Sequence, residues 1–234
     1  MTSALPSVVI VTGTDTGVGK TVTTAALASV LAAGRTVAVY KPVQTGVDDA
    51  APADIDEVRR LSGLTSVFDG ARLRDPLAPR AAARREGVRL PGLVEHARRI
   101  DALAADYDHV LVEGVGGLLV GLDDDGHALV DLPRFLTSRA VFVIVCRAGL
   151  GTLNHTGLTV HALRARNCEL VGIVIGSWPE IPDLAARSNL VDLPSTADVL
   201  LVGRIPERAA ALEPAVFQEL SVSWFTPPLG SWQP

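Results

Sequence analysis

The sequence predicts a three-layer α/β domain in which a mostly parallel sheet is flanked by helices. Strand-sized apolar runs alternate along the chain with segments whose apolar residues recur at helical spacing, an order that produces parallel sheets. The first run, residues 8–11, is β-branched and lacks polar alternation, which is typical of a strand buried on both faces. No linker or break in composition divides the 234 residues, so we expect one domain spanning residues 1–234.

The other elements follow from apolar periodicity and from glycine and proline positions. An alanine-rich helix is expected from residue 21 to about Gly34, and a short helix over residues 55–62 should stop at Gly63. Residues 64–92 are expected to be mostly loop, and the prediction weakens after about residue 218, where the tail should either pack or be disordered. The remaining expected helices cover residues 81–85, 93–105 and about 151–167, and the remaining expected strands cover 36–40, 110–113, 140–145, 170–175 and 199–205.

Composition disfavours several classes of protein. With 26 acidic and 21 basic residues, the chain is not expected to bind nucleic acid in general, and its strand-sized apolar runs predict no membrane segment. Cys146 and Cys168 are expected to be free thiols and the N-terminus lacks a secretion signal, so we expect a cytoplasmic protein. Only two of the 21 basic residues, Lys20 and Lys41, are lysines, which indicates positions where a compact point charge is needed.

Residues 13–21, the phosphate loop, join the first strand to the first helix and predict a site for nucleotide phosphates. Gly17 and Gly19 let the backbone curl so that its N–H groups point at an anion, and the helix N-terminus adds its positive end. Lys20 supplies an ammonium for the β- and γ-phosphates, and Thr21 supplies a hydroxyl for Mg²⁺. Gly13 lies one residue earlier than the usual spacing requires. The alternative is a glycine-rich turn with an incidental lysine, which the combination of strand, loop, Lys-Thr pair and helix disfavours.

Charged residues at two further strands should face the same crevice, because ligands of open α/β sheets bind at the carboxyl ends of the strands. Lys41 and Thr45 follow the second expected strand, and Glu113 ends the third. A carboxylate there is suited to organising a metal ion, although a turn or helix-capping role is the alternative. The helix N-terminus after residue 150 could hold a second anion. The acidic turn at residues 123–126 is expected to be solvated, and no histidine is assigned a role.

These features define a nucleotide-dependent Mg²⁺ enzyme and leave three classes open. They are a ligase that activates an acid with ATP, a conformational-switch ATPase that drives a protein partner, and a GTPase. No N-K-x-D stretch for guanine recognition follows a strand, so the GTPase lacks support. Switch ATPases usually carry a lysine early in the phosphate loop, where this chain has Asp15. The ligase is therefore favoured.

The motifs at residues 13–21, 41–46, 112–117 and 150–155 resemble, in the same order, those of the dethiobiotin synthetase family. The resemblance implies a P-loop NTPase-like fold and a ligase of biotin biosynthesis. Such an enzyme uses Mg²⁺ and ATP, or another nucleoside triphosphate, to close 7,8-diaminononanoate and CO₂ or bicarbonate into a cyclic urea. The resemblance also implies a homodimer that holds the substrate carboxylate across its interface.

The same resemblance assigns roles to individual residues. Lys20 and Lys41 would be catalytic, and Thr21, Asp54 and Glu113 would bind Mg²⁺. Asp54 is preferred over the nearby Asp48, Asp49 and Asp56 because of its place directly before the helix at 55–62. The substrate-binding residues would be Thr16, Lys41, Thr45, Leu150, Gly151 and Asn154. The nucleotide-binding residues would be Gly17, Val18, Gly19, Lys20, Thr21, Val22, Asp54, Glu113, Gly114, Val115, Gly116, Gly176, Ser177, Ile205, Pro206 and Glu207.

One departure from the family pattern concerns the nucleotide base. Where relatives place an asparagine that reads adenine, this chain has Gly176. Because an absent side chain cannot discriminate bases by hydrogen bonding, we expect relaxed nucleotide selectivity, with backbone contacts from Gly176, Ser177 and Pro206.

Overall fold

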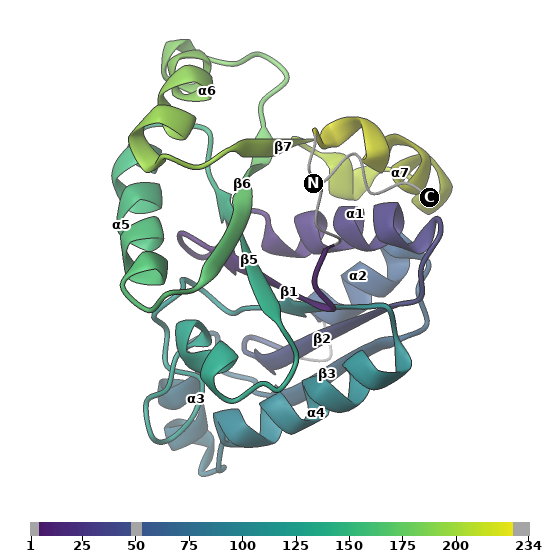
Figure 1. Cartoon of the computed structure of the whole chain (residues 1–234), viewed down its shortest axis with the longest axis vertical. Coiled ribbons are helices and arrows are strands. Elements are labelled where there is room, and N and C mark those ends of the chain that lie inside the picture. Colours follow the sequence, from purple (N-terminus) through teal and green to yellow (C-terminus); the bar gives the residue numbers. More distant parts are fainter. Residues whose placement is uncertain (1–4, 48–52, 227–234) are drawn as a thin grey trace.

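Seven strands form one parallel sheet in the order β3-β2-β4-β1-β5-β6-β7 (Figure 1). The structure is a computed structural model that describes residues 5–47 and 53–226. The strands are β1 (Val8–Gly13), β2 (Val37–Gln44), β3 (Val67–Arg72), β4 (His109–Glu113), β5 (Ala140–Cys146), β6 (Glu169–Trp178) and β7 (Leu201–Pro206). The helices are α1 (Lys20–Ala32), α2 (Asp54–Ser62), α3 (Pro79–Glu86), α4 (Leu93–Asp106), α5 (Thr152–Arg164), α6 (Leu184–Ala197) and α7 (Pro214–Ser221), with short 3-10 helices η1 (Leu129–Arg134), η2 (Ala209–Ala211) and η3 (Val222–Trp224).

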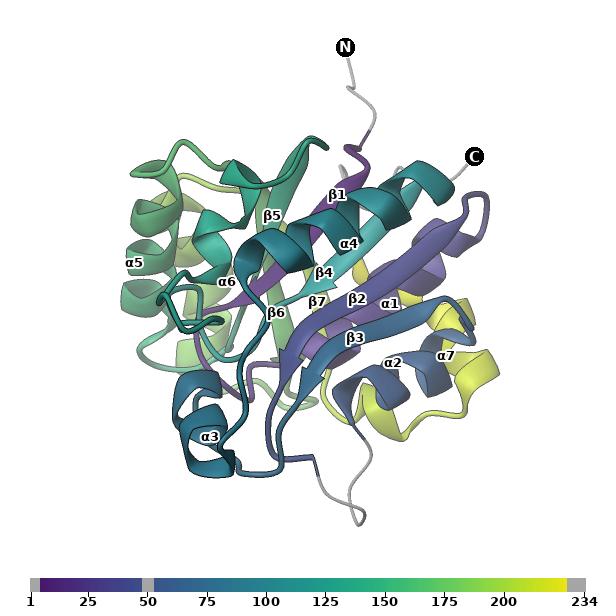
Figure 2. The ribbon, with the colours of Figure 1, turned by 90° about the horizontal axis from the view of Figure 1, so that it is seen from below.

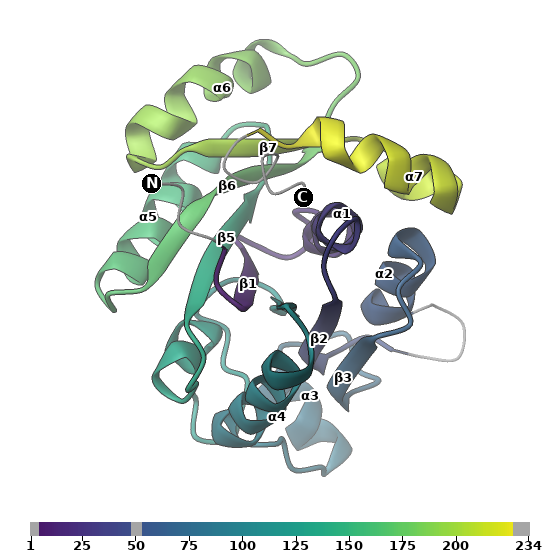
Figure 3. The same ribbon diagram turned by 45° about the vertical axis from the view of Figure 1, so that its right-hand side comes forward.

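Helices cover both faces of the sheet, and each face has its own hydrophobic core (Figures 2 and 3). On one face α1, α2 and α7 pack over alternate strand residues such as Val9 and Val11. On the other face α4, α5 and α6 cover the intervening residues, including Val8 and Ile10. Every residue of β1 is buried, as expected for the central strand of a parallel sheet. The three-layer α/β fold predicted from the sequence is confirmed.

The predicted helices are found close to their expected bounds. α2 ends at Gly63, whose φ of 71° is the left-handed conformation that glycine adopts at helix ends. α3 ends in the same way at Gly87. α1 ends at Ala32, slightly before Gly34, where its end was predicted. Glycine thus marks the end of α2, as the sequence indicated, and the end of α3, which the sequence analysis did not assign.

β2 is longer than predicted, which changes the setting of Lys41. The expected strand ended at residue 40, whereas β2 continues to Gln44. Pro42 fits inside this strand because β2 pairs only with β3 at that point, its pairing with β4 having ended at Tyr40. Lys41 therefore lies in a strand rather than in the loop that follows one, and its side chain is buried.

The sequence did not predict β3, α6 or α7, and β6, like β2, is longer than expected. β3 lies in the stretch predicted as loop, and only Val67 of this edge strand is buried, so it has no apolar run to reveal it. α6 contains Pro194, which interrupts its helical pattern. β6 extends to Trp178, so Gly176 and Ser177 belong to the strand instead of following it.

The tail packs as far as the structure describes it. Phe217 and Trp224 meet edge to face, with ring centroids 5.0 Å apart, in the core that also contains α1. Phe225 is buried and forms an antiparallel bridge with Gly203 of β7. The packing alternative is therefore confirmed for residues 219–226, while residues 227–234 lie outside the described part. Among the described helices, none combines the length and apolar character that a membrane crossing requires.

Candidate functional site

The phosphate loop is held in a conformation that requires glycine. Gly17 and Gly19 have φ values of 71° and 94°. A Cβ atom on Gly19 would also lie 2.2 Å from the carbonyl oxygen of Gly176, so β6 approaches the loop more closely than any side chain allows. Lys20 folds back over the loop, and its Nζ donates to the carbonyl oxygen of Asp15 at 3.0 Å. The loop and Lys20 are therefore arranged around a space that suits an anion.

Lys41 joins the two carboxylates that the sequence assigned to a metal ion. Its Nζ lies 2.6 Å from Oε1 of Glu113 and 2.7 Å from Oδ2 of Asp54. Lys41 and Glu113 are 1% and 0% exposed, whereas Asp54 is 48% exposed and stands at the rim. The hydroxyl of Thr21 donates to the same Oε1 of Glu113 at 2.9 Å. Side chains from α1, β2, α2 and β4 thus meet at one point.

Burial and charge have different net effects on the two lysines. Burial is the main cause that lowers the pKa of Lys20, and the negative charge of Glu113 only partly opposes it. Burial would also lower the pKa of Lys41, but the adjacent Glu113 and Asp54 outweigh it and hold that pKa above its ordinary value. Lys41 is therefore firmly charged without a ligand, whereas an arriving anion would stabilise the charge of Lys20.

The oxygen atoms around Glu113 fit Mg²⁺. This ion prefers hard oxygen ligands, which Thr21, Asp54 and Glu113 supply. Within residues 5–47 and 53–226, Oε2 of Glu113 is buried and has no hydrogen-bond partner. An unpaired buried carboxylate oxygen is costly, and a bound cation would remove that cost.

A cavity of about 810 Å³ opens over these groups. It contains most of the residues expected for the phosphates, the metal and the substrate, namely Thr16, Gly17, Gly19, Lys20, Thr21, Val22, Lys41, Thr45, Asp54, Gly114, Val115 and Gly116. Residues 76–79 and Val120 also line it, and the sequence analysis missed both. Residues 75–79 (D-P-L-A-P) contain no motif. Their two prolines, which restrict the backbone, are the one signal in the sequence that could have drawn attention to them.

Several predicted site residues lie elsewhere. Leu150, Gly151 and Asn154 are exposed at the N-terminus of α5 and do not line this cavity. Ile205 is buried in the core, so only its backbone could reach a nucleotide. Val18 is likewise buried in that core beneath the phosphate loop.

The remaining predicted residues lie near the ends of β6 and β7 and around α2. Ser177, Pro206 and Glu207 are exposed near the carboxyl ends of β6 and β7, where the backbone N–H of Glu207 donates to the carbonyl oxygen of Trp178 at 2.7 Å. Asp56 pairs with Arg59 on the outer face of α2, which supports the choice of Asp54. Asp48 and Asp49 lie outside the described residues.

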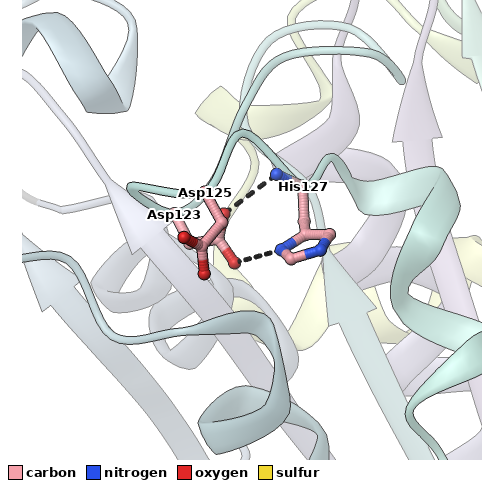
Figure 4. A group of neighbouring side chains, drawn as sticks. All are labelled: Asp123, Asp125 and His127. Carbon is pink, nitrogen blue, oxygen red and sulfur yellow. Dashed lines mark hydrogen bonds and ion pairs between the residues drawn. The ribbon is translucent and has the colours of Figure 1, made fainter.

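The acidic turn at residues 123–126 is not simply solvated, as the sequence analysis expected. Asp123 is 1% exposed, and its carboxylate accepts hydrogen bonds from the backbone N–H groups of Leu93 and His127 at 3.0 and 2.9 Å. Nδ1 of His127 lies 2.8 Å from the same carboxylate, with Asp125 beside it (Figure 4). Asp123 therefore ties this loop to the start of α4. This role could not be predicted from the sequence because Leu93 lies 30 residues before Asp123 along the chain.

A parallel sheet whose first strand leads through a glycine-rich loop to Lys20 and Thr21, with Glu113 ending a neighbouring strand, defines a P-loop NTPase. Solved structures share this fold. The ParA family ATPase from Chlorobium tepidum superposes with a TM-score of 0.58 at 14% identity, covering 94% of this chain and 93% of that one. The septum site-determining protein MinD from Pyrococcus horikoshii, complexed with Mg-ADP, gives 0.51 at 20% identity, covering 92% and 94%.

Sequence comparison gives the family. Residues 7–215 match the family model described as an AAA domain. The chain is 52% identical to the ATP-dependent dethiobiotin synthetase BioD of Streptomyces avermitilis over 96% of its own length and 94% of the relative. It is 51% identical to the protein of the same name from Streptomyces coelicolor, with the same coverage of both chains. The chain therefore belongs to this AAA-domain family and to the dethiobiotin synthetase family, as its motifs indicated.

Proposed function

We propose that the protein is an ATP-dependent dethiobiotin synthetase. It joins 7,8-diaminononanoate and CO₂ into the cyclic urea of dethiobiotin, using Mg²⁺ and a nucleoside triphosphate and releasing the diphosphate and phosphate. The proposal rests on identity of about 50% over nearly the whole chain and on one observation of the site. Two buried lysines and the carboxylate of Asp54 line a single cavity beside the phosphate loop, and Lys41 also pairs with the fully buried Glu113 behind it.

The roles of the charged residues follow from the reaction. One amine captures CO₂ as a carbamate, whose oxygen attacks the γ-phosphate to form a carbamic-phosphoric anhydride. The second amine then closes the ring and expels phosphate. Lys20 stabilises the negative charge on the phosphoryl group as it is transferred. Lys41 offsets the repulsion between the carbamate and the γ-phosphate. Thr21, Asp54 and Glu113 hold Mg²⁺, which would neutralise the phosphate charge.

The substrate is proposed to bind between two copies of the chain. Thr16 and Thr45 line the cavity and would contact the diamine. Leu150, Gly151 and Asn154 of the partner subunit would hold the substrate carboxylate, since the corresponding residues of this chain are exposed and do not line its own cavity. Leu119 and Leu158 are 58% and 61% exposed beside a second hollow at the phosphate loop, and such apolar surface suits an interface. Sedimentation velocity should show a dimer, and Leu150→Asp should shift it towards monomer.

The proposed function comes with a proposed location and one alternative function. The protein is proposed to act in the cytoplasm, where its two free cysteines, Cys146 and Cys168, suit a reducing compartment. The likeness of its fold to ParA and MinD favours, as a second candidate, a switch ATPase that acts on a protein partner. Asp15 stands against this second reading, because switch ATPases usually carry lysine early in the loop.

The decisive assay combines the protein with ATP, Mg²⁺, bicarbonate and the diamine, and detects the cyclic urea by mass spectrometry. Product should form only when all four are present, and Lys20→Met should abolish it. Nucleotide hydrolysis that needs no diamine, responds to a protein partner and yields no urea would establish the switch ATPase instead.

A further inference from the structure

The ammonium group of Lys41 occupies the centre of the residues proposed to bind Mg²⁺. It contacts Oε1 of Glu113 at 2.6 Å and Oδ2 of Asp54 at 2.7 Å, while Thr21 donates to the same Glu113 oxygen. The third direction around Nζ faces the carbonyl oxygen of Gly114 at 3.5 Å. An ammonium group has three N–H donors, so Lys41 has none left for a substrate.

Lys41 and a metal ion cannot both use these carboxylates without a large electrostatic cost. Lys41 and Glu113 are almost completely buried, so solvent screens their neighbourhood poorly. A metal ion bound to Asp54 and to the free Oε2 of Glu113 would still lie beside the Lys41 ammonium group, and the two cations would repel each other strongly. Conversely, removing Lys41 without a replacement would leave the buried Glu113 unpaired, which is also costly. The two carboxylates therefore need one cation at a time.

Lys20 lies in a different environment. Its Nζ contacts a neutral carbonyl oxygen, that of Asp15, and its pKa is lowered mainly by burial. Phosphate oxygens can therefore accept hydrogen bonds from Lys20 without breaking an ion pair. Of the two lysines in the cavity, Lys41 is the one bound to the carboxylates of the metal set.

We propose that Lys41 acts as a stand-in cation for the metal and leaves Asp54 and Glu113 when the metal and nucleotide bind together. The proposal rests on the proposed function. Released from the carboxylates, Lys41 has its N–H donors free for the γ-phosphate and the carbamate. The chain would thus engage its second catalytic lysine only after the metal–nucleotide complex is in place, so productive capture of the carbamate follows nucleotide binding.

The small number of lysines allows a direct test, because Lys20 and Lys41 are the only two in the sequence. Protein labelled with ¹³C at lysine Cε and ¹⁵N at Nζ should give two side-chain signals, which Lys20→Met assigns. A nonhydrolysable ATP analogue with EDTA should shift the Lys20 signal and leave that of Lys41 near its starting position. The analogue with Mg²⁺ should then shift the Lys41 signal. The proposal is overturned if Lys41 keeps its signal position with both bound, or moves equally without metal.

A second measurement uses Mn²⁺ as the probe in the absence of nucleotide. Lys41→Met should bind Mn²⁺ at least about tenfold more tightly than the unsubstituted protein, because the competing charge is gone. Lys20→Met, which keeps the ion pairs of Lys41, is the matched control and should change Mn²⁺ affinity much less. Equal affinity in Lys41→Met and the unsubstituted protein would overturn the proposal, and if Lys41→Met does not fold, the labelled protein decides. Neither measurement uses the diamine, so both stand apart from the test of the proposed function.

Discussion

Replacing Gly176 by alanine tests whether β6 sets the position of the phosphate loop. A Cβ atom at this position would lie 2.1 Å from the carbonyl oxygen of Val18 and 2.5 Å from Cγ1 of Val145. Because real Cβ contacts are essentially never shorter than 3.0 Å, the loop or the strand must move by at least 0.9 Å. The nearest atom belongs to the backbone, so a side-chain rotation cannot relieve the contact.

The expected magnitude follows from this displacement. Overpacking of this kind costs about 1–3 kcal/mol of unfolding free energy. For a chain of this size each kcal/mol lowers the melting temperature by about 2–4 °C, so we expect a decrease of roughly 2–12 °C. A displacement of about 1 Å in a loop that positions phosphates also reduces turnover by about 100-fold.

Calorimetry and steady-state kinetics with ATP measure both effects. Gly157→Ala is the matched control, since a Cβ on Gly157 of α5 would meet no heavy atom within 4 Å. That variant should melt at or slightly above the original temperature, because alanine favours a helix over glycine by about 1 kcal/mol. If Gly176→Ala keeps both its melting temperature and its kcat/KM for ATP, close packing by β6 does not hold the loop.

Three further outcomes are expected. Lys41→Arg should lower kcat by about 100-fold or more, because a planar guanidinium cannot replace an ammonium in this closed site, and near-native turnover would remove Lys41 from the mechanism. The protein should use CTP or GTP with kcat/KM comparable to ATP, since Gly176 offers no side chain to the base, and a hundredfold preference for ATP would refute this. Burial lowers the pKa of His96 to about 4, whereas the unfolded chain keeps a value near 6.5, so the unfolded state binds more protons between these pH values. Stability should therefore fall by ~3 kcal/mol as the pH decreases from 6.5 to 4, and urea unfolding of His96→Gln should show a weaker pH dependence over that range.

Much of the site could be predicted because its residues stand in motifs at strand ends. The sequence placed Thr21, Lys41 and Glu113 at one edge of a parallel sheet, and the structure brings both Thr21 and Lys41 within hydrogen-bond distance of Glu113. It did not predict that Lys41 is bound to Asp54 and Glu113, because side-chain pairing depends on the register between β2, α2 and β4. It also placed Lys41 in a loop, since a proline inside a strand is tolerated only where one neighbour is missing.

The failures elsewhere have similar causes. β3 was not predicted because an edge strand needs few buried residues and its sequence, V-F-D-G-A-R, contains no alternating apolar pattern. Asp123 was expected in solvent because acidic turns usually are, and its partner Leu93 is brought near only by the folded chain. Local periodicity thus predicted α1, α4 and α5 well, whereas the proline-containing α6, the edge strand and the long-range polar contacts depended on the tertiary structure.

The packing of α7 and η3 against α1 has a consequence for how the protein is made. The helix that presents Lys20 is synthesised well before Phe217, Trp224 and Phe225, which complete the core beside it. On the ribosome, α1 would therefore keep part of its apolar surface uncovered until α7 and η3 have been made. A nascent chain that stops before α7 would contain every motif of the proposed active site. It would still lack the apolar residues that pack against the helix carrying Lys20.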